Sequence, residues 1–173
     1  MNESPETRAG TAWLKRIQQH LPGFQGYEDA RIRSGEDERL RNHLAGIVAK
    51  GISRLEQFVI LAANEKRLDL LSDFEQMITG LQTLRRELET AAESADEDLE
   101  IDCESISECH REDFELIESL NAFTDRIEHF EAPLPERNDV LLLLKTLDRL
   151  LLRTGERKKR WGGTRADPES ADG

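Results

Sequence analysis

The sequence has few of the residues that build catalytic centres or cross membranes. Aromatic residues make up 5% of the 173 positions, and there are two cysteines and four histidines. Its longest strongly apolar run, Val140–Leu144, is far shorter than the about 20 residues that a transmembrane helix needs. The first ten residues contain no apolar stretch of the kind that a signal peptide has. We therefore expect a cytoplasmic protein.

The two cysteines are expected to be reduced thiols. Cys103 and Cys109 lie six residues apart in a segment that we expect to be helical. That spacing turns their side chains away from a common face, whereas a disulfide requires two Cα atoms close together. Reduced thiols agree with a reducing compartment.

Negative charge is concentrated in one segment. The chain has a formal net charge of -12, and the stretch from Glu87 to Glu118 holds 14 acidic residues and one basic residue. This balance disfavours nucleic acid as a partner because phosphates are repelled. Two interpretations stay open for this segment: a solvated hairpin tip, or an acidic surface that docks a basic partner. The acidic surface would comprise Asp96, Glu97, Asp98, Glu100, Asp102 and Glu104.

A second charged group lies near the end of the sequence and is basic. One interpretation is compensation of a helix dipole at its carboxyl end. The alternative is contact with an anionic lipid or acidic surface, including the acidic hairpin of the chain itself. The group consists of Arg153, Arg157, Lys158, Lys159 and Arg160.

Apolar residues recur every three or four positions along most of the chain, which predicts amphipathic helices. We expect helices at about 11–21, 34–63, 67–94, 101–131 and 138–154, the last ending at Gly155. The break between 63 and 67 holds no glycine or proline, so one very long helix is the alternative. The fold class is all-α: an antiparallel four-helix up-down bundle, coiled-coil-like, with a short N-terminal amphipathic helix. Residues 11–161 form one domain, and 1–10 and 162–173 are expected to be disordered tails.

Motifs for enzyme chemistry or metal binding are missing from the sequence. Di-iron bundles carry Glu three residues before His, but none of the four histidines has Glu there. The sequence also contains no HExxH, phosphate-binding loop or GxSxG motif. We therefore predict no cofactor, no metal ligand and no catalytic residue, with an unrecognised metal-binding bundle as a remaining alternative.

The N-terminal helix and the turn after it supply the candidate partner-docking residues. Either these apolar side chains pack across the bundle, or they form a docking face for a partner or a membrane surface. The candidates are Trp13, Leu14, Ile17, Leu21, Phe24 and Tyr27.

The segment Leu21–Tyr27 (LPGFQGY), followed by Arg33, Asp37, Leu40 and Arg41, resembles the opening of an uncharacterised family of bacterial all-helical proteins. Members begin with LPGYxGY and continue into a charged RRxxDxxLR-like helix. Here Phe24 replaces the tyrosine, and Ser34-Gly35 interrupts the charged helix. The resemblance implies a bacterial, helical, cytoplasmic protein. The motif is interpreted as an elbow in which Pro22 and Gly23 turn the chain and the aromatic residues fix the short helix to the bundle.

These patterns together predict a non-catalytic protein–protein interaction or scaffold module. Its partner is an unidentified protein, with a second copy of the chain among the candidates because apolar stripes pair between chains as well as within one. A peripheral membrane-associated protein is the alternative, through 11–21 and the basic end.

Overall fold

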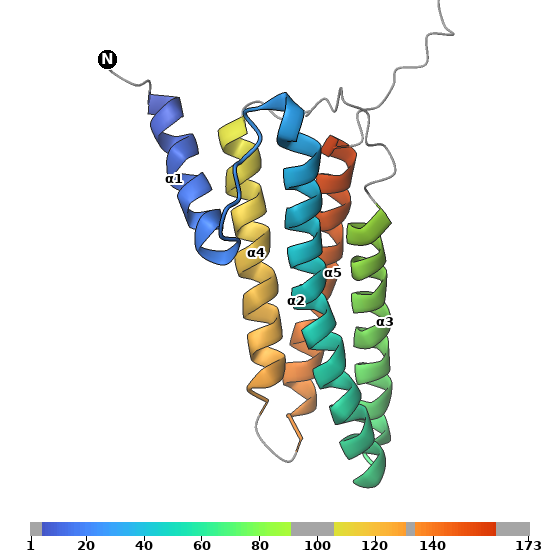
Figure 1. The fold of residues 1–173 in the computed structure, drawn as a ribbon. Helices are drawn as coiled ribbons and strands as arrows, with labels where there is room; N and C mark the ends of the chain where they lie inside the picture. Colours follow the sequence, from blue (N-terminus) through green and yellow to red (C-terminus); the bar gives the residue numbers. More distant parts are fainter. Residues whose placement is uncertain (1–4, 91–105, 131–133, 162–173) are drawn as a thin grey trace, which may run out of the picture.

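The computed structural model describes residues 5–90, 106–130 and 134–161. These residues form five helices: α1 (Pro5–His20), α2 (Ala30–Asn64), α3 (Leu68–Thr90), α4 (Ile106–Glu128) and α5 (Arg137–Trp161). Helices α2 to α5 make the bundle, and α1 lies outside it against α4 (Figure 1). The predicted all-α bundle with an extra N-terminal helix is confirmed.

The helices of the bundle alternate in direction along the chain, but not every consecutive pair lies side by side. Helices α2 and α4 run in one direction and α3 and α5 in the other (Figure 1). Helix α2 contacts α3 and α4, and α5 contacts the same two helices. The α2–α3 and α4–α5 pairs are therefore antiparallel, whereas α2–α4 and α3–α5 are parallel neighbours. The chain thus alternates in direction from α2 to α5, while two of the four neighbouring pairs are parallel.

The core is built from the predicted helical stripes. On α5, Val140, Leu143, Leu147 and Leu150 are buried, and Leu144 is partly buried against them. Burial of one such side chain contributes about 1.5–3 kcal/mol relative to leaving it exposed. The largest side chains that are completely buried on the other elements include Tyr27, Phe24, Phe74, Ile17, Leu40, Leu44, Leu55, Leu70, Met77 and Leu81.

The ambiguous break between the second and third predicted helices is a tight turn. Lys66 has a left-handed backbone, with φ at 55°. The N–H of Arg67 donates to the carbonyl of Ala62 at 2.9 Å, and that of Lys66 donates to Ala63 at 3.2 Å. This is the Schellman arrangement that ends a helix by satisfying its last carbonyls. The chain therefore has two helices here, and the alternative of one long helix is wrong.

Several helix boundaries differ from those predicted. Helix α1 begins at Pro5, inside the segment that we expected to be disordered. Helix α2 begins at Ala30 instead of Ser34, because the Asp29 side chain caps it by accepting from the backbone N–H of Arg31. Helix α5 does not stop at Gly155 but continues to Trp161. The tail 162–173, which was expected to be disordered, lies outside the described residues.

None of the described helices combines the length and apolar character that crossing a membrane would require.

Candidate functional site: the α4–α5 face

The elbow between α1 and α2 places Tyr27 inside one end of the bundle. Gly23 and Gly26 both have positive φ, at 79° and 84°, which glycine adopts without strain. At Gly26 a side chain would also collide, because an added Cβ would lie 2.6 Å from Oε2 of Glu28 and 3.0 Å from Nε2 of His110. Phe24 and Tyr27 are completely buried. The elbow interpretation of this motif agrees with the structure.

A group of buried charges surrounds the Tyr27 hydroxyl. That hydroxyl donates to Oδ2 of Asp113 on α4 at 2.5 Å. Arg157 on α5 donates through Nε to Oδ1 of Asp113 at 2.6 Å and through Nη2 to Oδ1 of Asp37 at 2.7 Å. Arg41 donates to the other Asp37 oxygen at 2.7 Å and to the carbonyl of Leu88 at 2.9 Å. We call Tyr27, Asp37, Arg41, Asp113 and Arg157 the buried ion network.

The buried ion network connects the elbow to every helix of the bundle. Arg157 spans the bundle diagonal, since it reaches α2 through Asp37 as well as the neighbouring α4 through Asp113. Its side chain is only 8% exposed. Two arginines balance two aspartates, so no net charge is buried. Such a group is costly to remove piece by piece, because each deletion leaves an unpaired charge inside the protein.

The electrostatic environment keeps the network in one protonation state. Burial is the largest effect on Tyr27 and, with nearby Asp113, holds its pKa well above the ordinary value. For Arg157, burial opposes the charged form, but Asp113 and Asp37 outweigh it and raise its pKa. Tyr27 therefore remains a phenol that donates to Asp113, and Arg157 remains a cation. The geometry fits a structural clamp better than a proton-transfer group.

Aromatic rings close the network on one side. Trp161, at the end of α5, packs edge-on against Tyr27 with ring centroids 4.6 Å apart, and the Arg157 guanidinium lies 5.1 Å from the Trp161 ring. His110 stacks on Tyr27 at 5.1 Å. His110 is completely buried, and neither ring nitrogen has a hydrogen-bond partner among the described residues. Burial lowers its pKa, an effect that Glu28 and Asp113 oppose.

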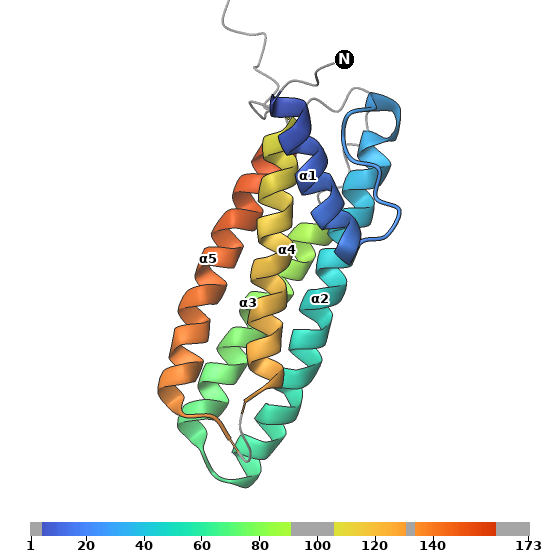
Figure 2. The ribbon, with the colours of Figure 1, turned by 90° about the vertical axis from the view of Figure 1, so that its left-hand side faces the viewer.

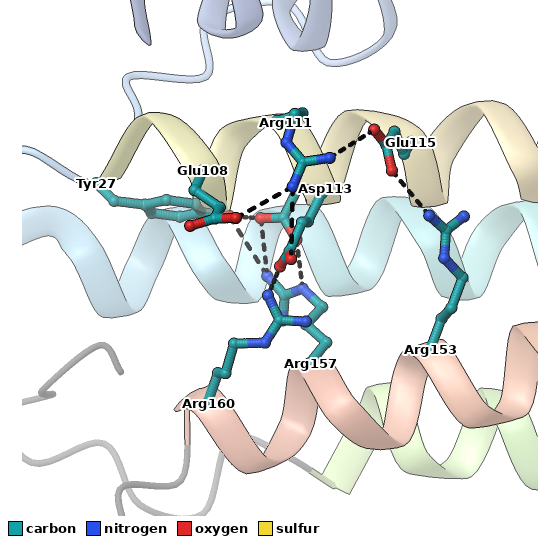
Figure 3. Close-up of polar contacts among 9 residues, drawn as sticks. Tyr27, Glu108, Arg111, Asp113, Glu115, Arg153, Arg157 and Arg160 are labelled. Atoms are coloured by element: carbon teal, nitrogen blue, oxygen red, sulfur yellow. Dashed lines mark hydrogen bonds and ion pairs between the residues drawn. The ribbon is translucent and has the colours of Figure 1, made fainter. Parts of the chain in front are cut away.

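A charged cleft of about 210 Å³ lies between α4 and α5, on the solvent side of the network (Figure 3). Four arginines and four carboxylates line it. Arg153 donates to Glu115 of α4 at 2.8 Å, and Arg160 pairs with Glu112. Arg111 bridges Glu108 and Glu115 along α4. Each of these outer pairs remains partly open to solvent, unlike the buried ion network.

The predicted docking residues are used inside the protein. Ile17, Phe24 and Tyr27 are buried, and Leu14 and Leu21 pack against the core. The structure thus favours the packing interpretation over a free docking face. Trp13, the sixth, packs on Phe114 of α4 with ring centroids 5.7 Å apart.

The two predicted charged surfaces have different outcomes. All six residues of the acidic surface, from Asp96 to Glu104, lie outside the described residues. The basic group separates into two sets. Lys158 and Lys159 are exposed, whereas Arg153, Arg157 and Arg160 pair with carboxylates at the start of α4.

The reduced-thiol prediction was wrong for Cys109, which is disulfide-bonded. That prediction rested on the six-residue spacing of the two cysteines within the helix expected over 101–131, of which the structure describes α4 from Ile106. The second cysteine of the sequence, Cys103, lies outside the described residues.

Sequence reasoning missed the buried ion network. One signal was available: Asp113 is spaced four residues from Cys109 and Ile117, on the same helical face as buried apolar residues. A carboxylate on an apolar stripe requires a cation. Its partner Arg157 was placed in the basic group beyond the expected helix end at Gly155, and contact of that group with the acidic hairpin of the chain itself was one of two interpretations.

Comparison with known proteins adds no relative: no protein family, no curated protein and no solved structure matches this chain. Among the described residues, no group of three or more His, Cys, Asp or Glu side chains is placed to hold a metal ion.

Proposed function

We propose that this chain is a non-catalytic protein–protein interaction module that docks its partner on the α4–α5 face. We define this face as the solvent side of the two helices, which includes the charged cleft, Arg149 and the exposed Leu142 and Leu152. Helix α1 lies on the other flank of α4 and leaves this face uncovered (Figure 2).

The observation that carries the proposal is the separation of charge between two adjacent helices. Helix α5 holds eight Lys and Arg and three Asp and Glu, a net charge of +5. Helix α4 holds two Arg and seven Asp and Glu, a net charge of -5. These totals include Arg157 and Asp113, which are buried, and Arg137, which pairs with Asp73 of α3. On the solvent side, Arg153 and Arg160 of α5 lie beside Glu115 and Glu112 of α4 and pair with them. Such a surface orients a charged partner and speeds its association.

Exposed leucines supply the apolar part of the face. Leu142 and Leu152 on α5 are 48% and 65% exposed, and Leu141 is also exposed. Ion pairs that remain exposed to solvent contribute little binding affinity by themselves. Apolar side chains that become buried on binding supply most of the affinity. Leucines flanked by ion pairs resemble the apolar centre and polar rim of protein interfaces.

The membrane alternative has less support at the segment for which it was expected. The apolar side chains of residues 11–21 pack against α4 and the core and do not form an outward face. Co-sedimentation with anionic vesicles tests the remaining contribution of α5. Pelleting that requires Leu152 would favour the membrane over a protein partner.

The function is tested by affinity capture from cells that express the chain. We expect a partner to be retained by the wild-type protein and lost with the double variant Leu142→Asp, Leu152→Asp. The matched control is Leu68→Asp on α3, because Leu68 is 71% exposed and lies outside the face. Equal retention by all three proteins would refute the α4–α5 face as the docking site.

A further inference from the structure

We infer that the α4–α5 face binds a second copy of this chain, about a two-fold axis parallel to the helices. In this dimer, α4 of each copy lies on α5 of the other. The inference rests on the proposed function, because it uses the same face, and it adds the identity of the partner.

Charge separation decides which arrangement is compatible with self-association. Two copies of a chain with net charge -12 repel each other over most orientations. A face-to-face dimer with its two-fold axis across the helices would set α4 against α4 and α5 against α5, so like charges would meet. An axis parallel to the helices sets each acidic α4 against a basic α5. Isologous interfaces require this kind of self-complementarity.

The position of the charges along the helices agrees with the same axis. Glu112 and Glu115 lie in the first half of α4, and Arg153 and Arg160 lie in the last half of α5. The start of α4 and the end of α5 lie at the same end of the bundle (Figure 1). A two-fold axis parallel to the helices keeps these ends together in the dimer. The acidic end of each α4 would then meet the basic end of the opposite α5.

The arginines that pair within one chain retain donors for the second copy. A guanidinium carries five N–H donors. The Arg153 side chain is 44% exposed, and its contacts within the chain are to Ser119 and Glu115. Its remaining donors can reach a carboxylate of the facing α4, and Arg149 is exposed on the same side of α5.

The face is large enough for a stable interface. Helix α5 has 25 residues and is therefore about 37 Å long. Two adjacent helices, each about 10 Å wide, offer roughly 740 Å² of face per copy. Stable interfaces bury about 800 Å² per partner. Leu142 and Leu152 would supply the desolvated centre of this interface.

Sedimentation velocity of the full-length chain, from micromolar to submillimolar concentration, tests the dimer. We expect a dimer whose affinity falls as salt rises, because exposed charge pairs are screened. Leu152→Asp and Arg149→Glu should each weaken dimerisation at least about tenfold. Leu68→Asp is the matched control and should leave the affinity unchanged.

The geometry is tested by zero-length carboxylate–amine cross-linking of mixed isotope-labelled and unlabelled chains. Links between copies should join Lys145 of α5 to α4 carboxylates. Links between copies that join other elements would overturn the arrangement. A strict monomer at the highest concentration would overturn self-association. The proposed function would survive that result if the captured partner were still lost with the Leu142→Asp, Leu152→Asp variant.

Discussion

Removal of the Arg157 side-chain charge should destabilise this protein more than any comparable change on the surface of α5. The variant Arg157→Met keeps most of the aliphatic stem but removes the cation between Asp113 and Asp37. Both carboxylates are at most 6% exposed, so water cannot easily replace the arginine. Breaking a buried pair in this way costs about 3–5 kcal/mol. That is a large part of the roughly 5–15 kcal/mol by which domains are stable.

The control lies one turn earlier on the same helix. Arg153 also pairs with a carboxylate of α4, Glu115, but the two side chains are 44% and 36% exposed. Exposed pairs contribute about 0–1 kcal/mol, so Arg153→Met should change the free energy of unfolding by no more than that. Urea denaturation followed by circular dichroism measures both variants. Equal costs for the two substitutions would refute the assignment of Arg157 to a buried ion network.

A second variant separates lost charge from lost packing. Adding Asp113→Asn to Arg157→Met removes the carboxylate that the first change leaves unpaired. We expect the double variant to be more stable than Arg157→Met by about 1–3 kcal/mol, because an unsatisfied buried charge is the main cost. If Asp113→Asn destabilised both backgrounds equally, the two side chains would not be coupled.

Three further predictions follow from the backbone and the core. Lys66→Gly should stabilise the protein by about 1 kcal/mol in urea denaturation, because a left-handed lysine is strained and glycine is not. Gly80→Ala should destabilise the protein by about 1–3 kcal/mol, because its Cβ would lie 2.6 Å from Leu147. Gly46→Ala, with no neighbour within 4 Å, should instead stabilise its helix by about 0.5–1 kcal/mol. Equal effects of the two substitutions would contradict the close approach of α3 and α5. Burial lowers the pKa of His110 in the folded protein, so the unfolded chain binds the proton more readily. The contribution of neutral His110 to folding stability is therefore complete above about pH 6.5 and is lost as the pH falls below it. His110→Phe should therefore lose less stability than the wild type between about pH 7.5 and about pH 5.5, and an unchanged pH profile would contradict this.

The helices and the core were predictable because both follow from local periodicity. The α5 leucines recur at helical spacing, and Leu143 and Leu147 of that stripe are buried. The arrangement of helices around the core was not predictable in the same way. Each amphipathic stripe is satisfied by any apolar neighbour, so the stripe of α3 does not specify whether α4 or α5 lies beside it.

The candidate site was missed for a reason that can be traced to one glycine. Gly155 was expected to end α5, which left Arg157 and Trp161 beyond the last predicted helix. A glycine within a helix costs only about 1 kcal/mol relative to alanine. Beyond Gly155, the helix gains the Arg157 pairs with Asp113 and Asp37 and the contact between Trp161 and Tyr27, at a ring distance of 4.6 Å. These long-range contacts outweigh the local preference, and they involve residues more than 40 positions apart that local periodicity does not connect.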